Sequence, residues 1–188
     1  MERAPITYVR HAMPAVDDAV TPTEWVLDDA GRAAAAELAG RLELPHGIDR
    51  LVSSTESKAL GTAEAIAERW GVEVVPDDRL REARRPWVGD GYRALAHAYL
   101  RGEALDGWEP HADVAARVAA AVDDAVGGAV AGAVVVVSHG LAISTHLRDR
   151  LGPEFDADSF WRSLVFPDAW VLDATDLLHR PLPHGAYS

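Results

Sequence analysis

Cysteine is absent from the 188 residues of this chain, which excludes structural disulfides and metal sites built from thiolates. No segment approaches the run of about 18 apolar residues that a membrane-spanning helix requires. The N-terminus also lacks a basic segment followed by an apolar one, the pattern of a secretory signal. These absences favour a protein of the cytoplasm that does not enter a membrane.

Basic residues are scarce as well. Lysine and arginine together number 18 against 30 aspartates and glutamates, so the formal net charge is −12. Nucleic acids and anionic membrane surfaces bind proteins through basic faces, so neither is an expected partner. An anionic small molecule would need a local cluster of cations to bind. The length and the hydrophobic content of 48% fit one domain over residues 1–188, and the sequence does not indicate the oligomeric state.

Apolar runs and helical spacings alternate along the chain. Strands are predicted over 6–9, 48–53, 72–75 and 133–137, with one or two more within 163–172. Helices are predicted over 28–43, from an N-cap at Ser54 to residue 70, over 114–125 and over 140–151. Residues 77–109 are expected to be irregular apart from a short helix at about 92–100, and the tail 179–188 is expected to be irregular. This alternation predicts an α/β fold with a largely parallel sheet between helices.

Polar residues with chemical capacity follow the predicted strands. In an open α/β sheet, ligands bind beyond the carboxyl ends of the strands, so we expect these residues to meet at one edge. They are the pair Arg10-His11, the pair Ser53-Ser54 with Lys58 in the next helical turn, the triplet Leu80-Arg81-Glu82, and the triplet Ser138-His139-Gly140.

This combination suits the transfer of a phosphoryl group through a histidine. A neutral imidazole is a good nucleophile near pH 7. Arginine, lysine and a second histidine can stabilise the charge on the phosphoryl oxygens. A carboxyl group can protonate the leaving oxygen and then activate water. The backbone N–H of Gly140, at the start of a helix, adds a further donor to an anion. The chemistry requires neither a metal nor a cofactor.

The same residues resemble the signatures of the histidine phosphatase superfamily, the phosphoglycerate-mutase-like proteins. Arg10-His11-Ala12 is similar to the family's Arg-His-Gly. Residues 54–64, STESKALGTAE, are similar to its Ser-x-x-x-Arg-Ala-x-x-Thr-Ala-Glu. Leu80-Arg81-Glu82 matches Leu-x-Glu, and Ser138-His139-Gly140 matches Ser-His-Gly. Four motifs occur in the family's order, and the resemblance extends to about residue 172.

The resemblance implies both a fold and a set of roles. The fold would be a three-layer α/β/α sandwich around a mostly parallel sheet with an antiparallel edge strand and a small cap at about 83–110. His11 would accept the phosphoryl group, and Glu82 would act as general acid and then as general base. Arg10 and His139 would bind the phosphoryl oxygens, and Lys58 would take the place of the family's second arginine.

The chain also departs from the family pattern. Ala12 and Pro14 replace a common glycine and threonine, and Asp17 stands where many members have an asparagine that helps to hold phosphate. Lysine at 58 keeps the charge but loses the bidentate geometry of arginine. From the lysine we expect activity that is retained but reduced, or a site that accepts a different pose of the phosphate.

Four residues are candidates for a substrate pocket: Asp17, Arg84, Arg85 and Trp87. Asp17 can point inward or belong to an acidic solvated loop. Arg84 and Arg85 can compensate for the missing arginine or form a solvated pair, and Trp87 can line a pocket or pack beneath a loop. The sequence leaves each of these alternatives open.

A cap of only about thirty residues favours hydrolysis over a mutase reaction, because water can reach a phosphohistidine beneath it. We therefore predict a phosphatase that acts on a phosphate monoester. A short cap also leaves room for a bulky substrate, including a phosphoprotein. Two alternatives remain at this stage: a phosphotransferase of the phosphoglycerate mutase type, and a catalytically weakened protein that binds a phosphorylated ligand as a regulator.

Overall fold

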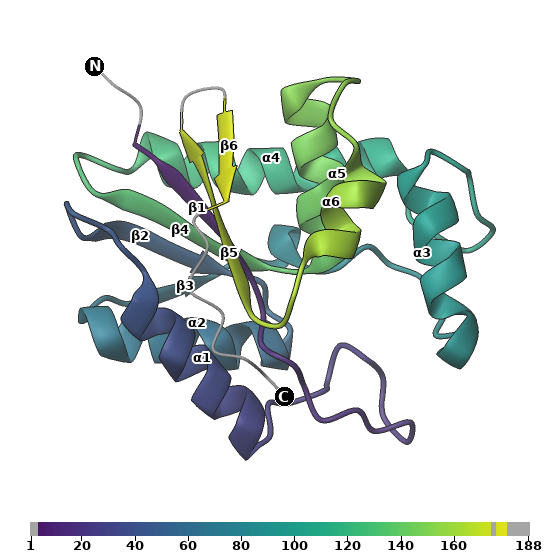
Figure 1. The fold of residues 1–188 in the computed structure, drawn as a ribbon, viewed down its shortest axis with the longest axis horizontal. Coiled ribbons are helices and arrows are strands. Elements are labelled where there is room, and N and C mark those ends of the chain that lie inside the picture. The colour runs from purple at the N-terminus through teal and green to yellow at the C-terminus, as the bar shows by residue number, and fades with distance from the viewer. Residues whose placement is uncertain (1–3, 174–175, 180–188) are drawn as a thin grey trace.

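In the computed structural model, which describes residues 4–173 and 176–179, a six-stranded sheet runs through the middle of the molecule (Figure 1). The strands are β1 (Ile6–Arg10), β2 (Ile48–Ser53), β3 (Val74–Pro76), β4 (Ala133–Ser138), β5 (Asp168–Asp173) and β6 (Asp176–His179). The helices are α1 (Asp29–Arg41), α2 (Ser57–Trp70), α3 (Tyr92–Leu100), α4 (His111–Gly127), α5 (Gly140–Leu151) and α6 (Ala157–Ser163). Two short 3₁₀ turns, Asp78–Leu80 and Gly89–Gly91, lie between β3 and α3.

The strand order is β3-β2-β4-β1-β5-β6. The first four strands of that order are parallel, with Val9 beside Val137 and Ser53 also beside Val137 on the other side. Strand β5 is antiparallel to β1, and β6 is antiparallel to β5. The predicted α/β class and mostly parallel sheet are therefore confirmed. The antiparallel strand lies one position inside the edge, because β6 adds to it through a short connection.

Helices cover both faces of the sheet (Figure 1). Alternate side chains of β4 point to opposite faces, so Val134 and Val136 contribute to one core while Val135 and Val137 contribute to the other. Helices α1 and α2 pack over Val135 and Val137, and α4 and α5 pack over the other pair. All four valines are fully buried, which explains the continuous apolar run of this strand.

Some local expectations were wrong or incomplete. Ser54 does not cap α2: the helix begins at Ser57 with Glu56 as its N-cap residue, and no side chain caps it. Neither α6 nor β6 was predicted, because both are short and their packing depends on residues distant in sequence. Residues 180–188 of the expected irregular tail lie outside the described residues, whereas His179 ends β6. No described helix is long and apolar enough to cross a membrane.

Candidate active site

A cavity of about 980 Å³ opens beyond the carboxyl ends of β1 and β4. Nine of the ten site residues predicted from the sequence line it: Arg10, His11, Lys58, Glu82, Arg84, Arg85, Trp87, His139 and Gly140. They come from segments far apart in the chain and meet because parallel strands deliver their following residues to one edge of the sheet. Asp17 does not line the cavity.

His11 follows the last residue of β1, and its ring is buried. Its Nδ1 lies 2.7 Å from the carbonyl oxygen of Ala12. Because a carbonyl oxygen only accepts, Nδ1 must carry the proton, and the lone pair of the neutral ring is then on Nε2. Burial first, and then the electrostatic interactions with the His139 ring and with Lys58, lower the pKa of His11 well below its usual value. The ring is therefore neutral at pH 7, with Nε2 available as a nucleophile.

His139 follows β4, and the centroid of its ring lies 5.0 Å from that of His11. Its Nε2 pairs with the hydroxyl of Ser54 at 2.8 Å. Its Nδ1 is buried and has no hydrogen-bond partner among the described residues. Burial first, and then the charges of Lys58 and Arg85, lower the pKa of His139 well below its usual value. If the Ser54 hydroxyl donates to Nε2, the proton of the neutral ring is on Nδ1, where it can be donated to a ligand.

Arg10 reaches the cavity from the end of β1. Its Nη1 donates to the carbonyl of Leu164 at 3.0 Å, and the guanidinium carbon lies 3.4 Å from the ring centroid of Phe166. Its buried Nε has no hydrogen-bond partner among the described residues. Burial lowers the pKa of Arg10 to about 10, so the group stays positively charged at neutral pH. The fork therefore keeps an unused donor beside the histidines.

Gly140 begins α5 directly after His139. A Cβ atom at this position would lie 2.8 Å from Nε1 of Trp161 and 3.5 Å from the guanidinium carbon of Arg10. The first distance is too short for any side chain, so the indole requires glycine here. This packing also keeps the backbone at the start of α5 open toward the cavity that Gly140 lines.

Glu82 lies half-buried opposite the start of α5. Its Oε1 accepts hydrogen bonds from the backbone nitrogens of Ala83 and Ala142, at 2.9 and 2.8 Å, and its Oε2 accepts a longer one of 3.2 Å from that of Leu141. The two bonds from α5 satisfy N–H groups of its first turn that have no partner inside the helix. The carboxyl group is thus fixed at the cavity edge, with Oε2 as its less engaged oxygen.

Lys58 is buried in the first turn of α2, where its Nζ has two partners. It lies 2.5 Å from Oε2 of Glu56 and 2.6 Å from the carbonyl oxygen of Pro22. Only 6% of Lys58 and 7% of Glu56 is exposed, so the ion pair is shielded from water. The charge of Lys58 is present in the cavity as predicted, but a carboxylate already compensates it.

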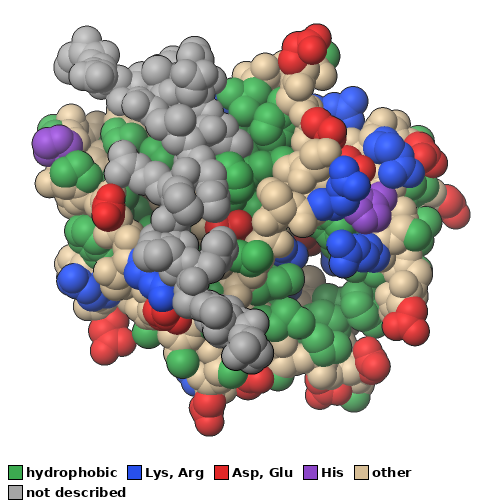
Figure 2. Space-filling view, viewed as in Figure 1, with side chains coloured by type: hydrophobic (Ala, Val, Ile, Leu, Met, Phe, Trp, Pro, Cys, Tyr) green, Lys and Arg blue, Asp and Glu red, His purple; other side chains and the backbone are tan. Residues whose placement is uncertain are grey.

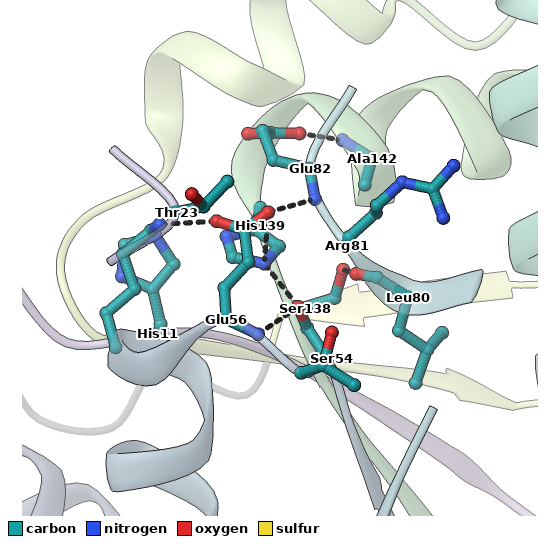
Figure 3. Close-up of polar contacts among 12 residues, drawn as sticks. His11, Thr23, Ser54, Glu56, Leu80, Arg81, Glu82, Ser138, His139 and Ala142 are labelled. Carbon is teal, nitrogen blue, oxygen red and sulfur yellow. Dashed lines mark hydrogen bonds and ion pairs between the residues drawn. The ribbon is translucent and has the colours of Figure 1, made fainter. Parts of the chain in front are cut away.

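Glu56 is a polar residue of this site that the sequence interpretation missed. Figure 3 shows the Glu56 side chain between the backbone of Glu82 and the ring of His139. Its Oε1 accepts a hydrogen bond of 2.8 Å from the backbone N–H of Glu82 and lies 3.6 Å from Nε2 of His139. The same carboxylate therefore contacts Lys58, Glu82 and His139. The only signal in the sequence was its place between Ser54 and Lys58, inside the motif, where an acid at the start of a helix is usually solvated.

Arg85 and Arg84 differ in their surroundings, although they are neighbours in sequence. The guanidinium of Arg85 lies 4.5 Å from the ring centroid of Tyr92, and its buried Nε has no hydrogen-bond partner among the described residues. Its charge also lowers the pKa of His139, after burial and Lys58. Arg84 is exposed. Arg85 is therefore the arginine that lies near the histidines.

The remaining pocket candidates also differ. Asp17 is exposed, and its carboxylate accepts a hydrogen bond from the backbone of Ala19 at 2.9 Å within its own turn. Its carbonyl accepts from Nε1 of Trp25 at 2.8 Å. Asp17 therefore shapes the segment after β1 and does not reach the cavity. Trp87 does line the cavity and packs edge-on against Trp25, with their ring centroids 5.0 Å apart.

The arrangement can bind a tetrahedral anion and attack it. Two guanidinium groups, each with an Nε that has no hydrogen-bond partner among the described residues, lie near a neutral imidazole, as does the unpartnered Nδ1 of His139. A carboxyl group lies at the same edge. Among residues 4–173 and 176–179 no group of three or more His, Cys, Asp or Glu side chains could hold a metal ion.

Comparison with known proteins agrees with this geometry. The family model of the histidine phosphatase superfamily (branch 1) matches residues 6–170. No curated protein matches the chain. Among solved structures, the native mycobacterial glucosyl-3-phosphoglycerate phosphatase is 26% identical, with 91% of each chain covered and a TM-score of 0.63.

Two further structures share the fold at lower identity. Bacillus stearothermophilus YhfR is 21% identical, with 94% of this chain and 95% of that chain covered and a TM-score of 0.69. A phosphoglycerate mutase from Bacillus anthracis is 15% identical, with 95% and 92% covered and a TM-score of 0.65. The fold is thus common to phosphatases and mutases.

Proposed function

This chain belongs to the histidine phosphatase superfamily (branch 1), and from that premise we propose that it is a phosphatase that hydrolyses a phosphate monoester through a phosphohistidine on His11. The observation that carries the proposal is the hydrogen bond from Nδ1 of His11 to the carbonyl of Ala12. It places the lone pair of a neutral, buried imidazole on Nε2, beside the cations of the cavity. That is the state a histidine needs in order to attack phosphorus.

The first step transfers the phosphoryl group to the protein. Nε2 of His11 attacks phosphorus, a P–N bond forms, and the bond between phosphorus and the ester oxygen breaks. Glu82 gives its proton to that oxygen, which leaves as an alcohol. The longer contact of its Oε2 gives this oxygen the most room for a proton. The products of the step are the alcohol, phosphohistidine and the Glu82 carboxylate.

The second step returns the site to its starting state. A water molecule gives a proton to the Glu82 carboxylate as its oxygen attacks phosphorus. A P–O bond forms and the P–N bond breaks, which releases inorganic phosphate and restores neutral His11. Glu82 is protonated again, so the cycle consumes one water and one ester.

Three donors are proposed to hold the phosphoryl oxygens: Arg10, His139 through Nδ1, and the backbone N–H of Gly140. Arg85 is proposed to supply the second guanidinium, because Lys58 is already paired with Glu56. This division is supported by three nitrogens that have no hydrogen-bond partner in the described part of the chain: Nε of both arginines and Nδ1 of His139. The charge of Lys58 is then largely balanced by Glu56.

Hydrolysis is favoured over a mutase reaction by the cap. The segment between Glu82 and α4 is short, and it includes exposed residues such as Arg84 and Trp87 beside the cavity. Water can therefore reach a phosphohistidine before a second substrate does. The phosphatase structure is 26% identical to this chain and the mutase structure 15%, so the likeness to the mutase concerns the fold alone.

The test is release of phosphate from an aryl phosphate, with a chelator present, by the intact protein and by His11→Ala. The proposal expects turnover that disappears in the variant. Interconversion of phosphoglycerates without net phosphate release would identify a mutase. Binding of phosphate without turnover at any pH from 5 to 8 would identify a regulatory protein. The mutase result and the regulatory result would each overturn the proposed phosphatase function.

A further inference from the structure

The cavity extends well past the phosphate site, and one of its walls is aromatic. Trp87 stands edge-on to Trp25 and lies 5.8 Å from Tyr92, measured between ring centroids. Tyr92 in turn stacks with Trp108 at 6.4 Å. All four rings line the cavity. Trp25 and Trp108 are buried, but 40% of Trp87 is exposed, so the described residues leave part of this indole uncovered.

The segment after β1 contributes exposed apolar side chains to the same cavity. Met13 is 50% exposed and Val16 is 54% exposed, and both line it together with Pro14 and Pro22. Figure 2 shows hydrophobic side chains gathered beside a hollow in the lower right of the molecule, near the segment that follows β1 in Figure 1. Clustered exposed apolar groups beside a reactive site indicate a ligand that covers them.

The charged groups of this outer region are mostly engaged. Arg81 pairs with Asp78 at 2.6 Å, and Glu109 is held by Arg117 at 2.9 Å. Arg85 lies over Tyr92, on the side of the phosphate site. Arg84 remains as one exposed cation. A substrate with a second anionic group would therefore find few partners outside the phosphate site.

We propose that the alcohol part of the substrate is an apolar or aromatic group, which lies against Trp87 and Val16 while the phosphate reaches His11. This inference rests on the proposed phosphatase function and adds the class of ester. It excludes a small polyanion such as a phosphoglycerate as the preferred substrate. The binding free energy comes from apolar area that both partners remove from water.

A series of straight-chain alkyl phosphates, from ethyl to hexyl, tests it. The leaving groups have similar basicity, so a change in kcat/KM along the series reports binding of the chain. We expect kcat/KM to rise about two- to fourfold for each added CH₂, since burial of one CH₂ contributes up to about 0.8 kcal/mol. Hexyl phosphate should also be a better substrate than 3-phosphoglycerate.

Two valines provide a matched comparison. Val16 and Val26 lie in the same segment and are 54% and 57% exposed, but only Val16 lines the cavity. Val16→Ser and Trp87→Ala should each reduce the dependence of kcat/KM on chain length. Val26→Ser should keep the dependence of the unchanged protein.

The possible results distinguish a failure of the apolar-substrate proposal from a failure of the proposed phosphatase function. Phosphate release that is independent of chain length, or that is fastest with 3-phosphoglycerate, overturns the apolar substrate and leaves the phosphatase intact. If no ester is hydrolysed, the proposed phosphatase function is wrong. The affinity of alkylphosphonates, measured by calorimetry, then still tests whether the pocket binds an apolar chain. Affinity that rises with chain length would then support the inference, and constant affinity would overturn it.

Discussion

The carboxylate of Glu56 lies 2.5 Å from the ammonium of Lys58, and both side chains are buried beside the proposed nucleophile. A lysine alone at this position would place an unshielded charge in the cavity. The pair instead makes the α2 end of the site nearly neutral and leaves the arginines and His139 to meet an anion. Glu56, two residues before Lys58, therefore supplies the counter-charge for the lysine that stands in place of the motif's arginine.

Removal of one member of this pair should destabilise the protein. Glu56→Gln leaves Lys58 buried without a counter-charge, which typically costs about 3–5 kcal/mol. The free energy of unfolding from urea titration measures it. Glu37→Gln is the control, because Glu37 pairs with Arg41 at the surface, where such pairs contribute at most about 1 kcal/mol. Equal losses for the two variants would contradict a shielded pair.

Arg85 and Arg84 should differ sharply on substitution. Arg85→Ala removes the guanidinium that we place at the phosphate, and loss of one such donor lowers kcat by about 10²-fold or more. Arg84→Ala removes an exposed group and should change kcat/KM by no more than about twofold. Inhibition by inorganic phosphate provides a second readout, which should weaken in Arg85→Ala. The assignment is wrong if Lys58→Met weakens phosphate inhibition and Arg85→Ala does not.

Glu82→Gln should show which step needs a proton. A p-nitrophenolate ion leaves readily without one, whereas an alkoxide does not. With an alkyl phosphate, the variant should therefore lose about 10²- to 10⁴-fold in kcat. With p-nitrophenyl phosphate, the rate of the first step should fall much less, and the burst of nitrophenol measures that rate. Equal losses in single-turnover measurements of both esters would argue that Glu82 only caps α5.

His146 should make the stability depend on pH. It is buried, with Nε2 2.9 Å from the hydroxyl of Tyr8, and burial lowers its pKa to about 4. Because the folded form resists protonation, this histidine supports folding fully above the unfolded pKa of about 6.5 and progressively less as pH falls toward 4. Between pH 7.5 and 5 the contribution to the loss of unfolding free energy is about 2 kcal/mol.

The variant His146→Gln retains a hydrogen-bond acceptor for Tyr8. Urea titrations at pH 7.5 and pH 5 give the loss of unfolding free energy between these two pH values. This loss should be about 2 kcal/mol smaller in the variant than in the unchanged protein. The other buried histidines and the carboxylates contribute equally to both proteins and cancel in the difference. An unchanged pH dependence would mean that His146 takes up a proton in the folded protein as easily as in the unfolded one.

Much of the fold followed from local patterns. The run Ala133–Val137 predicted a central strand because both faces of β4 are covered, and the helical spacings located α1, α2, α4 and α5 within a few residues. The motifs at the strand ends predicted six residues that line one cavity, and three of the four further pocket candidates, Arg84, Arg85 and Trp87, line it too. Their catalytic roles stay predictions, which the variants above test.

What the sequence could not supply depends on contacts between distant segments. Glu56 is indistinguishable from a solvated acid until Lys58, Glu82 and His139 are placed around it. Ser54 has the residue type of a helix cap but pairs with His139. Trp25 and Tyr92 join an aromatic wall only after the segment following β1 lies beside the cap. In each case burial by a distant element decides the role.

A covalent bond between phosphorus and Nε2 of His11 defines the proposed mechanism, and trapping that phosphohistidine is the decisive experiment. The protein is mixed with an aryl phosphate, quenched within milliseconds in denaturant at alkaline pH, digested, and analysed by mass spectrometry. A phosphohistidine mechanism predicts one added phosphoryl group on the peptide that contains His11, which is lost in mild acid, and no label in His11→Ala. Steady turnover with no label on that peptide, or a label on His139 instead, would contradict it.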